Sequence, residues 1–293
     1  MSYEKIVHQD NRADWLVERR NSIGASDCPS ILGLTSWASP TSVQADKWGK
    51  LDEPERAEYL EWGNLMEDDI LEMFRRRTGI EVEPFGWMIR DQAVPWLHAT
   101  PDGLGDDGRF VQCKNVSAFG DLDYWRNGEC PPKVFAQQQH EFIVSGHTVS
   151  WVAANLLGSE LVVIEVCRDE NFIERWLKIA GAFWQATLAG EPLVSDGDPA
   201  THAALAKIYP GNKGSALREV GADWVEKVSE QTIRAAEIKR LTALSEQFKA
   251  EAKQVAGDDG GLLLPDGRRV VVQRVEMKES VRKAHTQTRV SIK

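Results

Sequence analysis

The strongest constraint on the fold lies in residues 98–114, where two turn signals precede a short predicted strand. Proline and glycine flank Asp102, and both residue types interrupt regular structure. A second turn signal, Gly-Asp-Asp-Gly at 105–108, precedes the run Phe-Val-Gln-Cys-Lys at 110–114. This pattern predicts a hairpin whose second strand covers 110–114, with Asp102 beside it.

Side chains two residues apart share one face of a strand, so Gln112 and Lys114 point the same way. If the strands pair around the 105–108 turn, Asp102 joins them, and a carboxylate, an amide and an amine converge. Such a trio is a partial metal site with a lysine placed to orient or activate water. The simpler interpretation is an ordinary Asp-Gly turn beside a solvent-facing lysine. The choice between this turn and a metal site depends on the other segments of the chain.

The composition of the 293-residue chain, with 42% hydrophobic and 27% charged residues, indicates a soluble globular protein. The sequence has neither an apolar run of 18 residues nor a signal peptide, which predicts no membrane insertion and a cytoplasmic location. The four cysteines have no Cys-x-x-Cys spacing, so we expect reduced thiols and no structural zinc.

The formal net charge of -10 is unevenly distributed along the chain. Residues 200–293 hold 17 Lys and Arg against 12 Asp and Glu, whereas residues 1–199 hold 18 against 33. Basic charge gathered on one segment can follow phosphates although the whole chain is acidic. A solvated tail explains the same composition equally well.

Residues 59–78 carry the clearest helix pattern, closed by a glycine. Glu67 shares a face with Ile70, Leu71 and Phe74, because it precedes them by three, four and seven residues. A carboxylate on a buried stripe is costly unless it has a partner. That partner is either a metal ion or an arginine.

Two further segments carry candidate binding groups. Arg19 precedes a small-residue loop, and the Ser26-Asp27 pair is a predicted N-cap of a helix with proline in its first turn, a suitable seat for phosphate or simply a capped helix. On the predicted helix 134–145, Gln137 and Glu141 share a face that can present amides to a metal-bound water or a phosphate oxygen. An exposed polar face is the alternative.

The rest of the chain predicts alternating strands and helices, and then a separate extension. Expected strands cover 86–90, 94–100, 149–157 and 161–167, and an amphipathic helix covers 170–188. We expect a core over 1–190, a linker over 191–222 and an extension over 223–293. In the extension, a long helix over 223–255 has only a thin apolar stripe, suited to one surface or another chain, and a hairpin follows at 260–276.

Five segments in order resemble the YqaJ-type viral recombinase family, the lambda-exonuclease-like branch of the PD-(D/E)XK nuclease superfamily. They are RRNSIGASD (19–27), EWGNLMEDDILEMF (61–74), TPDGL (100–104), VQCKN (111–115) and AQQQHEFIVSG (136–146). The resemblance spans about residues 12–190. It implies an α/β (α+β) fold: a restriction-endonuclease-like core with a central mixed sheet flanked by helices, plus a helical and hairpin C-terminal extension.

The resemblance also implies a metal centre. Asp102 matches the aspartate that binds a divalent cation, Mg²⁺ or Mn²⁺, and Lys114 matches the catalytic lysine. Glu67 matches an acidic residue that ligates the metal or lies just outside its ligand shell. Gln112 and the backbone carbonyl of Cys113 are expected as weaker oxygen ligands.

Gln112 departs from the family pattern, which usually has Asp or Glu at this position. An amide offers a carbonyl oxygen but no charge, so hard Mg²⁺ should be held more weakly. Glu67, or a carboxylate from the other helix such as Glu141, can restore the charge.

For the substrate, the resemblance implies that Arg19 contacts the phosphate at a 5′ end, with Ser26 beside it, and that Gln137 lines the site. Members of the family degrade linear duplex DNA from 5′ ends in phage-type recombination. The expected partners are double-stranded DNA ends, a single-strand-annealing recombinase and further copies of the chain in a ring, inside a bacterial host cell.

Two other functions remain open from the sequence. The first is a DNA-binding protein that keeps the nuclease fold but cuts weakly or not at all, for which Gln112 is the motivating feature. The second is a restriction-type endonuclease of the same superfamily. The latter cuts closed circular DNA, which an end-dependent exonuclease leaves intact.

Overall fold

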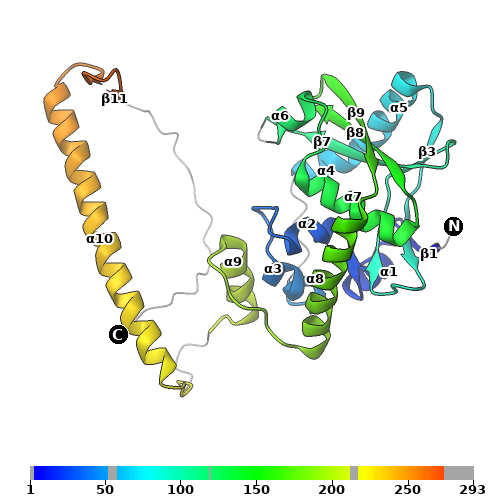
Figure 1. Ribbon diagram of the computed structural model, residues 1–293, viewed down its shortest axis with the longest axis horizontal. Coiled ribbons are helices and arrows are strands. Elements are labelled where there is room, and N and C mark those ends of the chain that lie inside the picture. Colours follow the sequence, from blue (N-terminus) through cyan, green and yellow to red (C-terminus); the bar gives the residue numbers. More distant parts are fainter. Residues whose placement is uncertain (1–2, 52–57, 119, 212–216, 274–293) are drawn as a thin grey trace. The chain divides into compact units, whose positions relative to one another are not determined.

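The computed structural model describes residues 3–51, 58–118, 120–211 and 217–273, and the chain divides into two compact units, Met1–Pro210 and Gly211–Lys293 (Figure 1). The strands described are β1 Tyr3–His8, β2 Ile23–Gly24, β3 Val82–Pro84, β4 Trp87–Asp91, β5 Leu97–His98, β6 Gly103–Gly105, β7 Phe110–Val116, β8 Val149–Leu156, β9 Glu160–Cys167, β10 Gly261–Leu263 and β11 Arg269–Val271. The helices described are α1 Arg12–Arg20, η1 Ala25–Asp27, α2 Cys28–Ile31, α3 Pro40–Lys47, α4 Glu58–Leu65, α5 Glu67–Thr78, α6 Leu122–Arg126, α7 Pro132–Ser145, α8 Glu170–Ala189, α9 Pro199–Ile208 and α10 Asp223–Ala256.

A five-stranded mixed sheet in the order β3-β6-β7-β8-β9 forms the centre of the first unit. Neighbouring strands are antiparallel except for β7 and β8, which are parallel. A parallel pair needs a long crossover connection, and α6 and α7 lie in the chain between β7 and β8. The predicted mixed sheet flanked by helices is confirmed.

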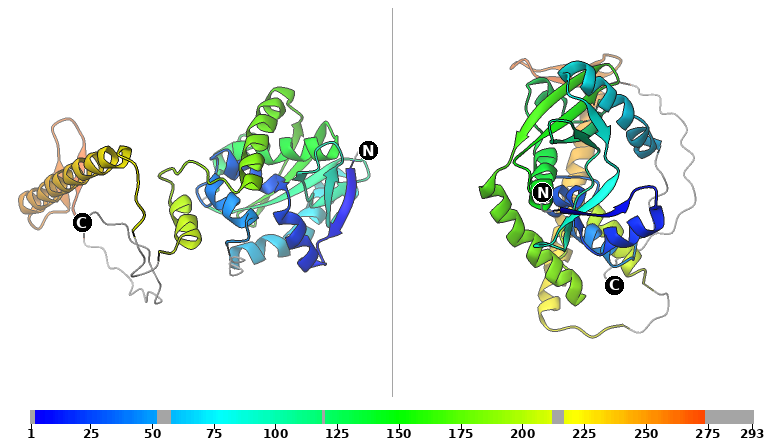
Figure 2. Two further views of the ribbon diagram at one scale, coloured as in Figure 1. Left: turned by 90° about the horizontal axis from the view of Figure 1, so that it is seen from below. Right: turned by 90° about the vertical axis from the view of Figure 1, so that its right-hand side faces the viewer.

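The two faces of this sheet are covered by different helices. Ile70, Leu71 and Phe74 of α5 pack with Val111 and the alternate side chains of β8 on one face. On the other face, α7 and α8 pack against the opposite set of β8 side chains, including Val152. Figure 2 shows the sheet and its helices from two further sides. Gln112 and Lys114 alternate with Val111, so they face α7.

The predicted helix over 59–78 is two helices, α4 and α5, separated at Met66. Three acidic residues, Glu67 to Asp69, occupy the first turn of α5, where they oppose the positive end of the helix dipole. Glu67 therefore begins a helix instead of lying within one. Its side chain is half-buried, one turn before the buried residues Ile70, Leu71 and Phe74.

The region before Asp102 also differs from expectation. The strand expected over 86–90 forms as β4, but it pairs with β1, a strand that the sequence did not predict. Of the strand expected over 94–100, only β5 forms, in a parallel pair with β2. The carboxylate of Asp91 accepts a hydrogen bond from the backbone N–H of Ala93 at 2.7 Å. The residues between Asp91 and β5 therefore form a turn instead of extending the strand.

The first compact unit continues past residue 190, where the sequence placed a linker. Helix α9 packs against α3, and the buried Thr201 hydroxyl donates to the Ser39 hydroxyl oxygen at 2.7 Å. In the second unit, α10 and the β10–β11 hairpin form as expected over the described residues, and the hairpin's expected end at 274–276 lies outside them.

Candidate active site

Asp102 lies between β6 and the open edge of β7. Strand β6 pairs with β7 only as far as Val111, which leaves the backbone of Cys113 free on that side. The N–H of Cys113 donates to Oδ2 of Asp102 at 2.7 Å. Because the N–H and C=O of a strand residue point to the same side, the Cys113 carbonyl also faces this edge.

A relay of side-chain hydrogen bonds connects Asp102 to Lys114. The side-chain amide of Gln112 donates to Oδ2 of Asp102. Oε1 of Gln112 accepts from Nε2 of Gln137 at 3.2 Å, and Oε1 of Gln137 accepts from Nζ of Lys114 at 3.0 Å. The structure therefore brings four of the residues singled out in the sequence into one network, between β7 and α7.

Glu67 reaches the same region from the other face of the sheet. Its backbone carbonyl lies 3.9 Å from Sγ of Cys113. Burial, followed by the charge of Asp102, raises the pKa of Glu67 to about 8, although Lys114 opposes the shift. Burial likewise raises the pKa of Asp102 to about 6, against the lowering effects of Lys114 and the Cys113 N–H. These carboxyl groups lie close enough to repel each other when ionised.

Glu141 lies on α7, four residues after Gln137. It is 1% exposed, and neither carboxyl oxygen has a hydrogen-bond partner in the part of the chain that the structure describes. Burial and the charge of Asp102 raise its pKa to about 8. The Gln138 amide opposes this shift, and its Nε2 is likewise without a hydrogen-bond partner among the described residues.

The residues around Asp102 fit a divalent cation. They offer carboxylate, amide and carbonyl oxygens, the ligand types that Mg²⁺ prefers, and Mg²⁺ commonly uses one or two carboxylates and several waters. The buried carboxyl group of Glu141, whose oxygens have no hydrogen-bond partner among the described residues, is a further oxygen donor in this region. Among the described residues, no three His, Cys, Asp or Glu side chains are already grouped for metal binding.

Arg19 belongs to a different set of ion pairs. Its guanidinium lies 2.6 Å from Asp46 and 3.6 Å from Asp27. Asp27 is the N-cap residue of α2 and proline lies in the first turn, as predicted, but its side chain makes no capping hydrogen bond. Oδ2 of Asp27 instead accepts from the Gly24 N–H at 2.9 Å and from Lys47 Nζ at 2.6 Å. Ser26 is exposed within η1, and α2 has only four residues.

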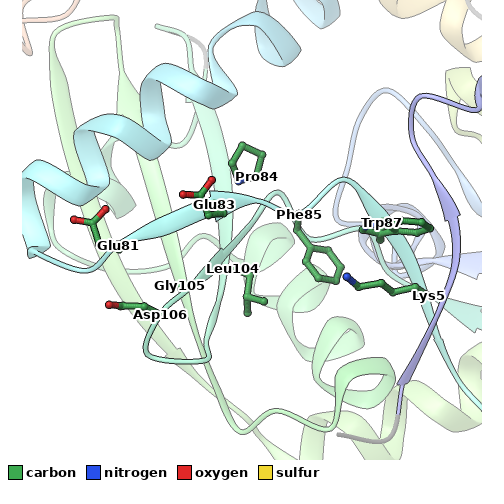
Figure 3. A pocket seen from close by; sticks show the side chains of 9 residues that line it. All are labelled: Lys5, Glu81, Glu83, Pro84, Phe85, Trp87, Leu104, Gly105 and Asp106. Carbon is green, nitrogen blue, oxygen red and sulfur yellow. The ribbon is translucent and has the colours of Figure 1, made fainter.

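A hollow of about 360 Å³ lies elsewhere on the first unit, over β3, β4 and β6 (Figure 3). Its ammonium group, Lys5 Nζ, lies 5.0 Å from the ring centre of Phe85 and 5.4 Å from that of Trp87. Acidic side chains line the other end (Figure 3). No residue of the Asp102–Lys114 relay lines this hollow, so the candidate active site is separate from it.

Comparison with known proteins finds a sequence match to the same family. Residues 14–148 match the YqaJ-like viral recombinase domain. The chain is 28% identical over 253 residues to the uncharacterized protein YqaJ of Bacillus subtilis, which covers 85% of this chain and 79% of that protein. Among the described residues, no helix is both long and apolar enough to cross a membrane.

The fold also matches a solved structure. An alkaline exonuclease from Laribacter hongkongensis superposes with a TM-score of 0.51 at 17% identity, covering 61% of this chain and 93% of that one, and a second structure of it contains dAMP. Identity this low is evidence for the fold alone. Residues 14–148 of this chain are therefore similar in sequence to the YqaJ-like viral recombinase domain, within a fold that the chain shares with an alkaline exonuclease.

Proposed function

We propose that this protein is a divalent-metal-dependent deoxyribonuclease that resects linear duplex DNA from 5′ ends in phage-type recombination. The observation that carries the proposal is the relay from Asp102 through Gln112 and Gln137 to Lys114, flanked by Glu67. The shared fold with an alkaline exonuclease, one that binds dAMP, supports it.

The residues of the site have separable roles in this proposal. Asp102, Glu67 and Gln112, with the Cys113 carbonyl, hold Mg²⁺ or Mn²⁺, whose chemistry there is to polarise a phosphoryl oxygen and acidify a bound water. Lys114, held at Nζ by Gln137, directs its positive charge at the scissile phosphate and orients the attacking water. Arg19 and Ser26 contact the phosphate at the 5′ end.

A DNA-binding protein that does not cut is the second candidate. Asp102 already accepts two hydrogen bonds at Oδ2, from the Cys113 N–H and the Gln112 amide. A glutamine that donates to the metal-binding aspartate occupies an acceptor site that a cation needs. This candidate predicts DNA binding that weakens with salt and no metal-dependent cleavage.

The test uses linear duplex DNA labelled at the 5′ or the 3′ end beside a closed circle, with Mg²⁺ and then with EDTA. We expect Mg²⁺-dependent loss of the 5′ label, an intact circle and no cleavage by Asp102→Ala. Cutting of the circle would favour a restriction-type endonuclease. Binding without cutting, with cutting restored by Gln112→Glu, would favour the second candidate.

The proposed partners are double-stranded DNA ends, a single-strand-annealing recombinase and further copies of the chain in a ring. The basic balance of residues 200–293 supports contact with DNA by the second unit. A pull-down of a purified annealing recombinase, repeated after nuclease treatment to remove bridging DNA, tests the second partner directly.

A further inference from the structure

Glu141 is a buried carboxyl group that the fold itself does not explain. It is 1% exposed, and both of its oxygens are without a hydrogen-bond partner among the described residues. Burying a polar group without such a bond is costly, and buried polar groups in native proteins nearly always have partners. A buried, unpartnered carboxyl therefore indicates a ligand that satisfies it.

The position of Glu141 on α7 indicates where that ligand lies. Glu141 follows Gln137 by four residues, so the two side chains are on the same face of the helix, one turn apart. Gln137 contacts both Gln112 and Lys114 of β7. Two neighbouring side chains of α7 face other elements: Gln138 contacts Ser150 on β8, and His140 contacts the backbone of His98.

The electrostatics of the region agree with this placement. After burial, the largest influence on the Glu141 carboxyl is the negative charge of Asp102, followed by the positive charge of Lys114. The same two residues are the main charged neighbours of Glu67. Asp102 therefore lies between two other acidic groups, one from α5 and one from α7.

Strand β7 has no carboxylate to bind a cation beside Asp102. Gln112 presents a neutral amide from β7, which leaves Asp102 without a second carboxylate from that strand. We propose that Glu141 supplies that missing carboxylate from α7 and binds the divalent cation together with Asp102. This inference rests on the proposed function, because it assigns a ligand to the same metal centre.

The competing interpretation is a structural one, in which Glu141 stays protonated and only fills space. The two interpretations differ in what Glu141→Gln does. The amide has nearly the shape of the carboxylic acid but never carries a charge, so the change preserves a structural role and weakens a metal-binding role.

The first experiment measures Mn²⁺ binding by electron paramagnetic resonance, which reports free Mn²⁺ without any need for turnover. The full chain is titrated in the presence of a phosphorothioate duplex that resists cleavage. Glu141→Gln should weaken Mn²⁺ binding by about 10–100-fold. Glu129→Gln, which removes an exposed carboxylate from the loop before α7, is the matched control and should bind like the wild type.

A second variant keeps the inference testable if Glu141→Gln fails to fold. The double variant Gln112→Glu, Glu141→Gln moves the carboxylate from the helix back to the strand, and it should bind Mn²⁺ like the wild type. In that case, absence of Mn²⁺ binding by the double variant overturns the inference. Thermal unfolding in EDTA establishes whether each variant is folded.

The outcomes separate this inference from the proposed function. Binding by folded Glu141→Gln within about twofold of the wild type would mean that Glu141 is not a ligand. A wild-type chain that binds no Mn²⁺ also overturns the inference. If the wild type binds Mn²⁺ through Glu141 but leaves linear DNA intact, the inference stands and the proposed nuclease function fails.

Discussion

The side chain of Gln137 is the only described connection between Lys114 and the aspartate side of the relay, so it fixes both ends of the site. Lysine has a long, flexible side chain with many rotamers, and an ammonium that is not held spreads its charge over a large volume. Gln137 accepts from Lys114 and donates to Gln112, which uses both ends of one amide. Position, rather than charge, is what this residue contributes.

Gln137→Ala should lower kcat by about 10–100-fold and leave KM for DNA nearly unchanged, because the lysine loses its orientation but keeps its charge. Single-turnover kinetics on linear duplex DNA measure this split. Gln92→Ala, at an exposed position, is the control. A larger effect on KM than on kcat would show that Gln137 binds substrate directly.

His140 links α7 to α8, and its buried, neutral ring predicts a loss of stability in acid. Its Nδ1 accepts from the Trp176 indole at 3.2 Å, and its Nε2 lies 3.1 Å from the His98 carbonyl oxygen, which together require a neutral ring with the proton on Nε2. Burial lowers the pKa of His140 to about 4, so the unfolded chain binds a proton at a pH where the folded chain does not. Stability should therefore fall as the pH drops from about 6.5 toward 4, by an amount on the order of 3 kcal/mol.

Urea unfolding between pH 7 and pH 4 measures this loss. His140→Gln should flatten the dependence in that window, although it lowers stability at pH 7. His202→Gln, at an exposed site, should reproduce the wild-type curve. An unchanged slope in His140→Gln would assign the acid sensitivity to another group.

At this scale, the sequence predicted the convergence of Asp102, Gln112 and Lys114, because turn residues and the two-residue period of a strand are local properties. It could not show that Glu141 is buried and unpartnered. Helical spacing tells which residues share a face, but whether that face meets β7 or solvent depends on long-range packing. Asp27 is a similar case, since its real partners, Lys47 and Arg19, come from other elements.

Among the elements, α1, η1 and α3 are joined by one buried ion-pair cluster. Lys47 Nζ lies 2.6 Å from Asp27 and also donates to the Arg19 carbonyl oxygen at 2.8 Å. Burial disfavours the ionised form of Asp27, but the charges of Lys47 and Arg19 outweigh it and hold the pKa of this carboxyl well below its usual range. The cluster fixes the loop that carries Ser26.

Lys47→Met should destabilise the first unit by about 3–5 kcal/mol, because it leaves a buried carboxylate without its closest cation. Chemical denaturation at pH 7 measures the change. Lys178→Met removes an exposed pair with Glu174 on α8 and should have little effect. A loss as small as that of the control would mean that Arg19 alone compensates Asp27.

Helices and strands with strong periodicity, such as α8 and the β8–β9 pair, were predicted because their apolar patterns are long and uninterrupted. The sequence did not predict the break between α4 and α5 or the pairing of β1 with β4. Strand pairing joins segments about 80 residues apart, and no local pattern specifies it. For β5 the sequence predicted too long a strand, because a local turn at Asp91 takes the place of its first residues.

The first unit is acidic and the second unit is basic. Residues 1–199 carry the acidic excess and residues 200–293 the basic one. An acidic catalytic unit repels DNA at long range, whereas a basic segment attracts it and steers the encounter. We therefore expect the second unit to contribute to DNA binding more than to the chemical step.

The long helix of the second unit has the surface of an assembly element. Only Ala252 and Ala256 of α10 are buried, and large apolar side chains along the helix are exposed: Trp224, Val225, Val228, Ile233, Ile238, Leu241, Leu244, Phe248 and Val255. An exposed apolar series of this kind is costly in water unless another surface covers it. This supports the proposed homo-oligomer, with α10 as part of its interface.

A chain that ends at Pro210 tests both roles of the second unit at once. Because residues 1–210 contain the sheet, its covering helices and the whole Asp102–Lys114 relay, the truncated protein should unfold cooperatively and keep Mn²⁺ binding. It should be monomeric by light scattering while the full chain is oligomeric, and its DNA affinity should fall and depend less steeply on salt. A truncated chain that keeps the full oligomer would place the interface in the first unit. Unchanged DNA affinity would show that the basic segment is only a solvated tail.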